Sequence, residues 1–101
     1  MDKPTPAQQR NKARNDISRA DRARQVTEEP MLQEALISIK GDLFRKFCDS
    51  QFGETEQREE IHRSMQNMIK LELYLESVMA DGKIGQHTLK FLDQSKKLTG
   101  L

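Results

Sequence analysis

The chain has 101 residues, of which 35% are hydrophobic and 33% are charged, and its formal net charge is +1. This length allows a single domain, and four Phe, one Tyr and no Trp predict a thin core. Cys48 is the only cysteine, which excludes an internal disulfide and a cysteine-based zinc site. Because no apolar run is long enough for a membrane span or a signal peptide, we expect a soluble intracellular protein.

Residues 6–27 are predicted to form a first, basic helix. Thr5 can accept hydrogen bonds from amides of the first turn, and Pro6 suits the first helical position. Residues 1–26 contain seven Lys or Arg against three Asp, which gives about +4 there and about −3 in the rest of the chain. Small side chains on the apolar face allow close approach to another helix but bury little area. That face consists of Ala13, Ile17, Ala20 and Ala23.

A second helix is predicted over residues 30–50. Pro30 separates it from the first helix, because proline has no amide to donate and disfavours helical geometry at Glu29. Apolar residues recur at intervals of three and four, which is typical of a helix that faces a core. This stripe comprises Leu32, Ala35, Leu36, Ile39, Leu43, Phe44 and Phe47.

The sequence FGET at 52–55 predicts a turn, with Gly53 in a left-handed conformation and Thr55 as the cap of the next helix. A third helix is predicted over residues 56–80. The two glycines of DGKIG, residues 81–85, predict its end, and a short last helix is predicted within 86–101.

These elements predict an all-α fold, in which an extended basic N-terminal helix leads into an antiparallel helical hairpin and a short C-terminal helix. The expected division is a basic helical arm, residues 1–29, and a hairpin domain, residues 30–101. Two apolar stripes joined by a short turn bury each other most readily as a hairpin. We therefore expect the third helix to pack on the second through Ile61, Met65, Met68, Leu75 and Val78 against Leu36, Ile39, Leu43 and Phe47.

Residues that could support catalysis are few and scattered. His62 and His87 are expected to be exposed polar side chains, and no histidine pair has the helical spacing of a zinc site. Cys48 is expected to be a half-buried apolar residue rather than a nucleophile. Gly82 and Gly85 lack the surrounding pattern of a phosphate-binding loop. We expect a protein that is not an enzyme and has no catalytic residues, cofactor or metal.

The basic first helix has three interpretations: a solvated tail, an arm that docks on another protein, or a nucleic-acid contact. Asp16 and Asp21 interrupt its basic face, and no aromatic residue is interleaved for base stacking, which disfavours nucleic acid. Small alanines beside arginines that can pair with carboxylates favour a protein partner that orders the helix. The predicted partner-binding residues are Arg14, Ile17, Arg19, Ala20, Arg22, Ala23 and Arg24.

Two runs carry a resemblance to a known group of proteins: RADRARQVTEEPMLQEALISIKGDLFRKF and ETEQREEIHRSMQNMIKLELYLESVMADGKI. They resemble small helical proteins encoded in the structural and packaging gene clusters of tailed bacteriophages, over about residues 19–92. The resemblance implies a virion or assembly component, with no catalytic residues to transfer. It also implies a location in the host cytoplasm during assembly and in the virion.

Three functions follow as hypotheses. The first is an assembly protein that binds a larger phage structural protein (portal, coat or scaffold) or a second copy of itself. The second is a small nucleic-acid-binding or DNA-packaging accessory that uses the basic arm. The third is a free regulatory protein that inhibits a host factor.

Overall fold

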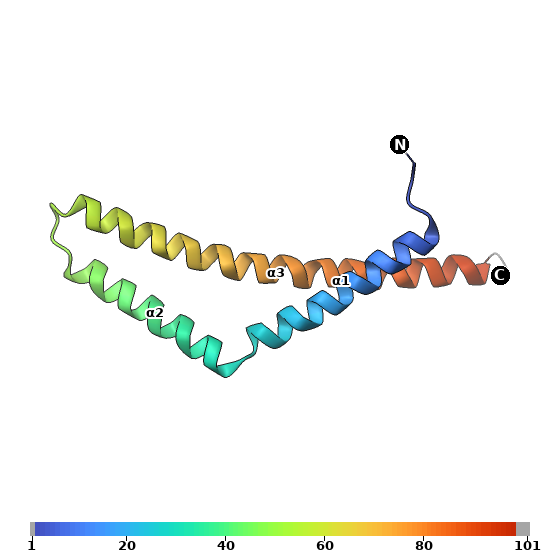
Figure 1. The fold of residues 1–101 in the computed structure, drawn as a ribbon, viewed down its shortest axis with the longest axis horizontal. Helices are drawn as coiled ribbons and strands as arrows, with labels where there is room; N and C mark the ends of the chain where they lie inside the picture. The colour runs from blue at the N-terminus through green and yellow to red at the C-terminus, as the bar shows by residue number, and fades with distance from the viewer. Residues whose placement is uncertain (1, 99–101) are drawn as a thin grey trace. The chain divides into compact units, whose positions relative to one another are not determined.

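The computed structural model describes residues 2–98, and the side chains of residues 2–95 (Figure 1). Three helices, α1 (Pro6–Thr27), α2 (Pro30–Asp49) and α3 (Thr55–Leu98), make up nearly all of this part of the chain. No strand occurs within residues 2–98. The all-α class predicted from the sequence is therefore confirmed.

The start of α1 is fixed by a reciprocal pair of hydrogen bonds between Thr5 and Gln8. The backbone N–H of Gln8 donates to Thr5 Oγ1 at 3.2 Å, and the backbone N–H of Thr5 donates to Gln8 Oε1 at 2.9 Å. This arrangement satisfies two amides that have no partner within the helix. It confirms the helix start predicted from Thr5 and Pro6.

The break between α1 and α2 is short and capped from both sides. Glu29 has an extended backbone, and its side chain accepts a hydrogen bond from the N–H of Met31 at 3.2 Å. The side-chain amide of Gln33 donates to the carbonyl oxygen of Thr27 at 3.0 Å, which satisfies the end of α1. Pro30 therefore begins a new helix, as predicted.

The turn between α2 and α3 differs in detail from the prediction. Ser50, with an extended backbone, is the C-cap of α2, and its Oγ donates to the carbonyl oxygen of Phe47 at 2.6 Å. Thr55 is the first residue of α3 rather than the residue that caps it. Ser50 therefore ends α2, a role that the sequence assigned to Gly53.

The helix α3 continues through residues 81–85, so the predicted end at Ala80 and the separate short last helix are wrong. Gly82 and Gly85 are buried, and α1 packs over both of them. The physical reason is that glycine also permits close approach between helices, and this packing offsets its low helix propensity. Residues 99–101 of the predicted last helix lie outside the described residues.

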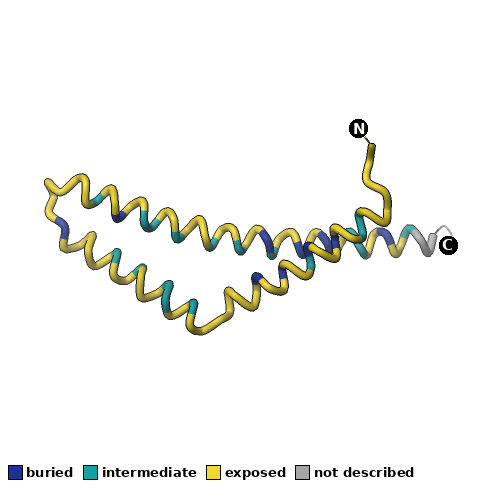
Figure 2. Tube along the Cα trace, viewed as in Figure 1, coloured by how far each residue is buried: buried dark blue, intermediate teal, exposed yellow. Residues whose placement is uncertain are grey.

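The chain forms two compact units whose boundaries cut across α3. One unit combines residues up to Gln25 with residues from Leu75 onward, and the other is Val26–Tyr74. This division does not coincide with the boundary at residue 29 that the sequence suggested. Buried positions gather on α1 and on the last part of α3, whereas α2 carries none (Figure 2).

Within the unit Val26–Tyr74, α2 and α3 are joined by polar and aromatic contacts. Lys40 Nζ lies 2.6 Å from Glu72 Oε1, and the guanidinium of Arg58 lies 4.9 Å from the ring centroid of Phe47. Arg58 Nε also donates to Ser50 Oγ at 2.9 Å. These contacts connect the two helices at the middle of α2 and at its C-terminal end.

The predicted core is present only in part. Ile61 and Val78 are buried, but Ile39 and Phe47 remain exposed on α2. The remaining predicted members are half-buried: Leu36, Leu43, Met65, Met68 and Leu75. Leu75 and Val78 belong to the unit that contains α1.

Candidate functional site

The helix α1 packs closely on the part of α3 that follows Leu75. Ala13, Ala20 and Ala23 are only 3%, 4% and 5% exposed. A Cβ at position 82 would overlap the Cβ of Ala20, and a Cβ at position 85 would lie 2.7 Å from the carbonyl oxygen of Ala13. A Cβ at either position would lie closer to α1 than real Cβ contacts allow. The two glycines therefore let the backbones of α1 and α3 meet.

This contact corrects the interpretation of α1 as an arm that has nothing to bury against its own chain. Ala20 packs on Gly82, and Ile17 is half-buried with its Cγ1 near Gly85. The prediction that small residues on α1 permit close helix approach is confirmed, but the helix they approach is α3 of the same chain. The glycines of residues 81–85 thus make a helix contact inside α3 and do not end the helix, contrary to the prediction from the sequence.

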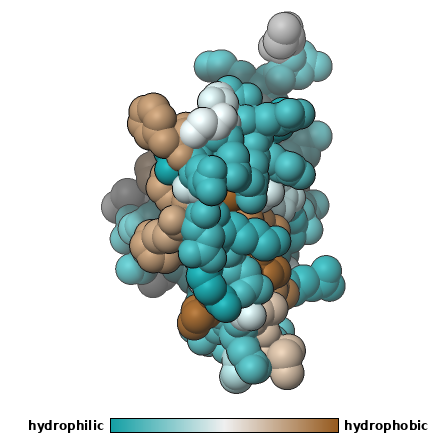
Figure 3. Space-filling view, turned by 90° about the vertical axis from the view of Figure 1, so that its left-hand side faces the viewer, coloured by the Kyte–Doolittle hydropathy of each residue, from teal (hydrophilic) through white to brown (hydrophobic). Residues whose placement is uncertain are grey.

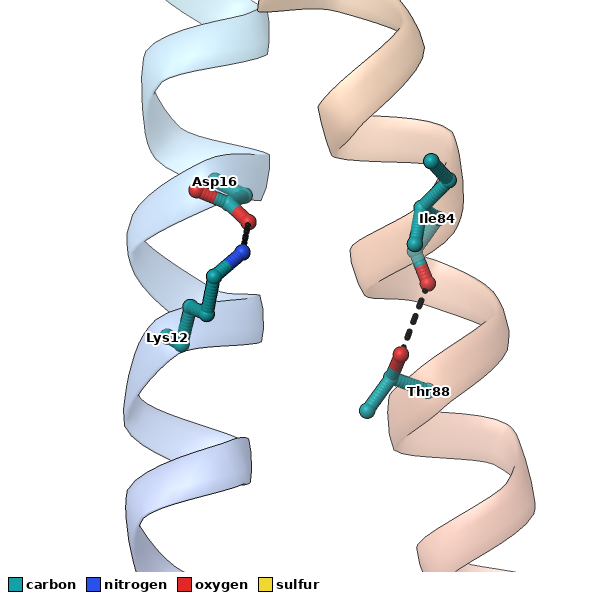
Figure 4. Close-up of polar contacts among 4 residues, drawn as sticks. All are labelled: Lys12, Asp16, Ile84 and Thr88. Carbon is teal, nitrogen blue, oxygen red and sulfur yellow. Dashed lines mark hydrogen bonds and ion pairs between the residues drawn. The ribbon is translucent and has the colours of Figure 1, made fainter. Parts of the chain in front are cut away.

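A polar pair on α1 lies beside this contact (Figure 4). Asp16 is buried, and its Oδ2 accepts a hydrogen bond from Lys12 Nζ at 2.8 Å. That hydrogen bond, together with the negative charge of Asp16, raises the pKa of Lys12, and the charge of Asp81 adds to the effect. The pair thus stabilises an acid that would otherwise lie unpaired at a helix contact.

A cleft of about 530 Å³ opens between the two helices next to this pair. The hydroxyl of Thr88 donates to the carbonyl oxygen of Ile84 at 3.0 Å, so its hydrogen is used within α3. The residues around the cleft are Gln9, Lys12, Ala13, Asp16, Ile84, Gly85, His87, Thr88 and Phe91.

The two histidines and the cysteine are surface residues. His62 and His87 are exposed, as predicted, whereas Cys48 is exposed rather than half-buried. Across the described residues, no cluster of three or more His, Cys, Asp or Glu is placed to hold a metal ion. No helix in the described range is both long and apolar enough to cross a membrane.

The arginines predicted to bind a partner remain on the surface of α1. Arg14, Arg19, Arg22 and Arg24 are all exposed, whereas Ala20 and Ala23 are buried within the chain. Arg24 Nη1 pairs with Asp21 Oδ1 at 3.0 Å. Arg14 and Arg22 form no ion pair with any other described residue, and they share the exposed side of α1 with uncharged polar residues. We call this surface the polar face of α1: Asn11, Arg14, Asn15, Ser18, Arg22 and Gln25.

Comparison with known proteins identified no relative of this chain. The chain matches no protein family, no curated protein and no solved structure.

Proposed function

We propose that the protein is a non-enzymatic component of a tailed bacteriophage that binds a larger structural protein of the particle, such as the portal, coat or scaffold. The resemblance of its sequence to phage structural and packaging proteins supports the phage origin. The polar face of α1 supports the binding role. In this proposal the protein acts in the host cytoplasm during assembly and remains in the virion.

The binding role rests on two guanidinium groups, those of Arg14 and Arg22, which form no ion pair within the described part of the chain and which project from a firmly packed helix. Because Ala13 and Ala20 hold α1 against α3, Arg14 and Arg22 project from a helix that is already ordered. An ordered guanidinium loses less conformational entropy when it binds a carboxylate, and it can do so with two parallel hydrogen bonds. We therefore assign the partner an acidic surface. The α2 helix and the first part of α3, held by the Lys40–Glu72 pair, form an antiparallel hairpin in this proposal.

Charge reversal on the polar face tests the proposal. The double variant Arg14→Glu/Arg22→Glu should fold normally but fail to co-purify with phage particles or assembly intermediates from infected cells. The matched control is Lys70→Glu/Lys90→Glu, which makes the same charge change at exposed positions of α3. Equal recovery of both variants with the particles would contradict the proposal, as would equal loss.

The polar face also supports the second function, binding to nucleic acid. Asp16 and Asp21, which interrupt the basic residues in the sequence, are paired with Lys12 and Arg24, so neither leaves an unpaired acid on this helix. Arginine, asparagine and serine side chains are common donors to phosphate oxygens.

Salt dependence separates the two functions. If two arginines contact phosphates, the slope of log affinity against log salt should fall by about 1.8 in the double variant, at about 0.9 per phosphate on duplex DNA. Recovery of phage proteins without DNA binding supports the first function. DNA binding with this change in slope supports the second.

A further inference from the structure

The α2 helix has an exposed side that is apolar and that nothing in its own unit covers. Ile37 is 72% exposed and Phe44 is 68% exposed. Gly41 lies between them, Cys48 follows one turn later, and both are exposed. The intervals of four, three and four residues place these side chains on one stripe of the helix. We call this stripe the outer face of α2: Ile37, Gly41, Phe44 and Cys48. Figure 3 looks at the end where α2 and α3 are joined and shows apolar surface among hydrophilic side chains.

Glycine at position 41 has no explanation within the chain. A Cβ added there would contact nothing within 4 Å, unlike one added at Gly82 or Gly85. Glycine inside a helix is less favourable than alanine, so it is usually found where a backbone must approach closely. At Gly82 and Gly85, the approaching backbone is that of α1. At Gly41 no backbone from the described part of its own chain approaches, so a close approach there requires another helix across the outer face of α2.

We propose that this helix is α2 of a second copy, crossing antiparallel with Gly41 at the two-fold axis. A two-fold axis at Gly41 brings Ile37 of one copy beside Phe44 of the other, and the reverse. The two bulky side chains then flank a close backbone contact at the two glycines. The contact is self-complementary in shape because the apolar residues lie on both sides of the glycine.

The charges on one edge of the outer face are self-complementary in the same arrangement. Glu34 and Arg45 are eleven residues apart, which is about three helical turns, so they lie on the same edge. An antiparallel two-fold places Glu34 of each copy near Arg45 of the other, which gives two ion pairs across the contact. Glu34 forms no ion pair with any described residue of its own chain. Arg45 uses Nη2 for Asp42 at 2.6 Å, and its other nitrogens remain as donors.

The position of Cys48 distinguishes the antiparallel arrangement from a parallel one. Cys48 is seven residues from Gly41, or about 10 Å along the helix. The two Cys48 residues therefore lie about 21 Å apart in the antiparallel pair, too far for a disulfide, whereas a parallel pair would place them side by side. Position 34 is seven residues from Gly41 on the opposite side, so in the antiparallel pair it lies next to Cys48 of the other copy.

Sedimentation of the full chain gives the first test. The unmodified chain should be a dimer at about 100 µM, and Ile37→Glu or Phe44→Glu should raise the dimer Kd at least about a hundredfold, because each change enters the contact twice. The matched control is Ile84→Glu, at an exposed isoleucine of α3, which should leave the dimer intact. A monomeric unmodified chain, or equal dissociation by all three variants, overturns the proposal.

Oxidative cross-linking gives the second test, and it does not depend on phage binding. The Glu34→Cys variant should form a covalent dimer through Cys48 under mild oxidant. The unmodified chain and the double variant Glu34→Cys/Cys48→Ser should not. Rapid formation of a Cys48–Cys48 disulfide in the unmodified chain would show parallel pairing and would overturn the proposal.

Discussion

Gly82 of α3 lies so close to Ala20 of α1 that a Cβ at position 82 would overlap the Cβ of the alanine. Three residues later, Gly85 meets the backbone of Ala13 in the same way. Apart from the half-buried Ile17, the contact consists of small side chains, so its strength depends on how closely the two backbones fit. Close fit gains dispersion energy from many atom pairs and is lost when one extra methyl group separates the helices.

Replacing Gly82 with Ala should destabilise the protein although alanine is the better helix former. Overpacking at a close contact costs about 1–3 kcal/mol, which exceeds the gain in helix propensity of about 1 kcal/mol. Chemical denaturation monitored by circular dichroism would measure the free energy of unfolding.

The matched control for this prediction is Gly41→Ala. Its added Cβ meets nothing in its own chain, so it should raise the free energy of unfolding by about 0.5–1 kcal/mol. Both variants should be measured in an Ile37→Glu background, which removes the proposed pairing of α2. Equal stabilisation by both alanines would contradict a close α1–α3 contact.

The Gly82→Ala variant should be rescued by removing the methyl group that it meets. The double variant Gly82→Ala/Ala20→Gly should recover at least about 1 kcal/mol relative to the sum of the single changes, since the two positions share one space. A double-mutant cycle of unfolding free energies measures this coupling. Strict additivity would show that the two residues do not touch.

The amides of α1 should be protected from hydrogen exchange in the isolated protein. Residues 13–23 are held by α3 of the same chain, so their protection should not change when the protein is diluted. Mass spectrometry of exchange in the unmodified protein and in Gly82→Glu would test this, because the glutamate should expose α1 selectively. Rapid exchange across residues 13–23 at every concentration would show instead that α1 depends on an outside partner.

The Lys12–Asp16 pair should contribute stability that is lost at alkaline pH. The folded protein raises the pKa of Lys12 above its ordinary value of 10.5, so it binds the lysine proton more tightly than the unfolded chain does. The contribution is therefore complete below about pH 10.5 and declines as the pH rises through the folded-state pKa. The difference in melting temperature between the unmodified protein and Lys12→Gln should therefore narrow only as the pH rises above about 10.5. A constant difference over that range would contradict the pairing.

Arg58 should stabilise the turn between α2 and α3 in two separable ways. Its guanidinium lies over Phe47, and its Nε donates to Ser50 Oγ. Phe47→Leu removes the ring but keeps an apolar side chain, and it should lower the free energy of unfolding by about 0.5–1 kcal/mol at this exposed site. Ser50→Ala should lower it by more, because it removes both the hydrogen bond from Arg58 and the one that Ser50 donates to the carbonyl oxygen of Phe47. Arg58→Met removes the ring contact and only one of these hydrogen bonds, so thermal melts should show a loss of stability smaller than the sum of the other two.

The sequence predicted the helix boundaries wherever a local signal has only one structural meaning. Thr5 with Pro6 and Glu29 with Pro30 mark helix starts through their own backbone chemistry, and both starts are found. Glycines are ambiguous because the same residue ends a helix or lets another helix approach. At Gly82 and Gly85 the choice depends on α1, which lies far away in the sequence, so the end predicted at Ala80 was wrong.

In the candidate site, too, the sequence did not predict features that depend on a helix far away in the chain. Arg14 and Arg22 were predicted to bind a partner, and they are exposed on the polar face of α1. The burial of Ala20 and Ala23 required a partner helix that local periodicity does not identify. Pairing the small faces of α1 and α3 would have found it, because alanine and glycine both recur there at helical intervals.

The contact between Ala20 and Gly82 joins positions that are 62 residues apart (82 minus 20), which sets the order of events during synthesis. At about 5–20 residues per second, the ribosome makes Gly82 roughly 3–12 s after Ala20. Throughout that interval the nascent α1 has no α3 to pack on. The face that later packs on α3 consists of Ala13, Ala20 and Ala23 with Ile17 as its one large apolar side chain, so it offers little apolar surface for aggregation before α3 is made. A face of alanines on α1, which packs on glycines of α3, therefore suits a helix whose partner is translated much later.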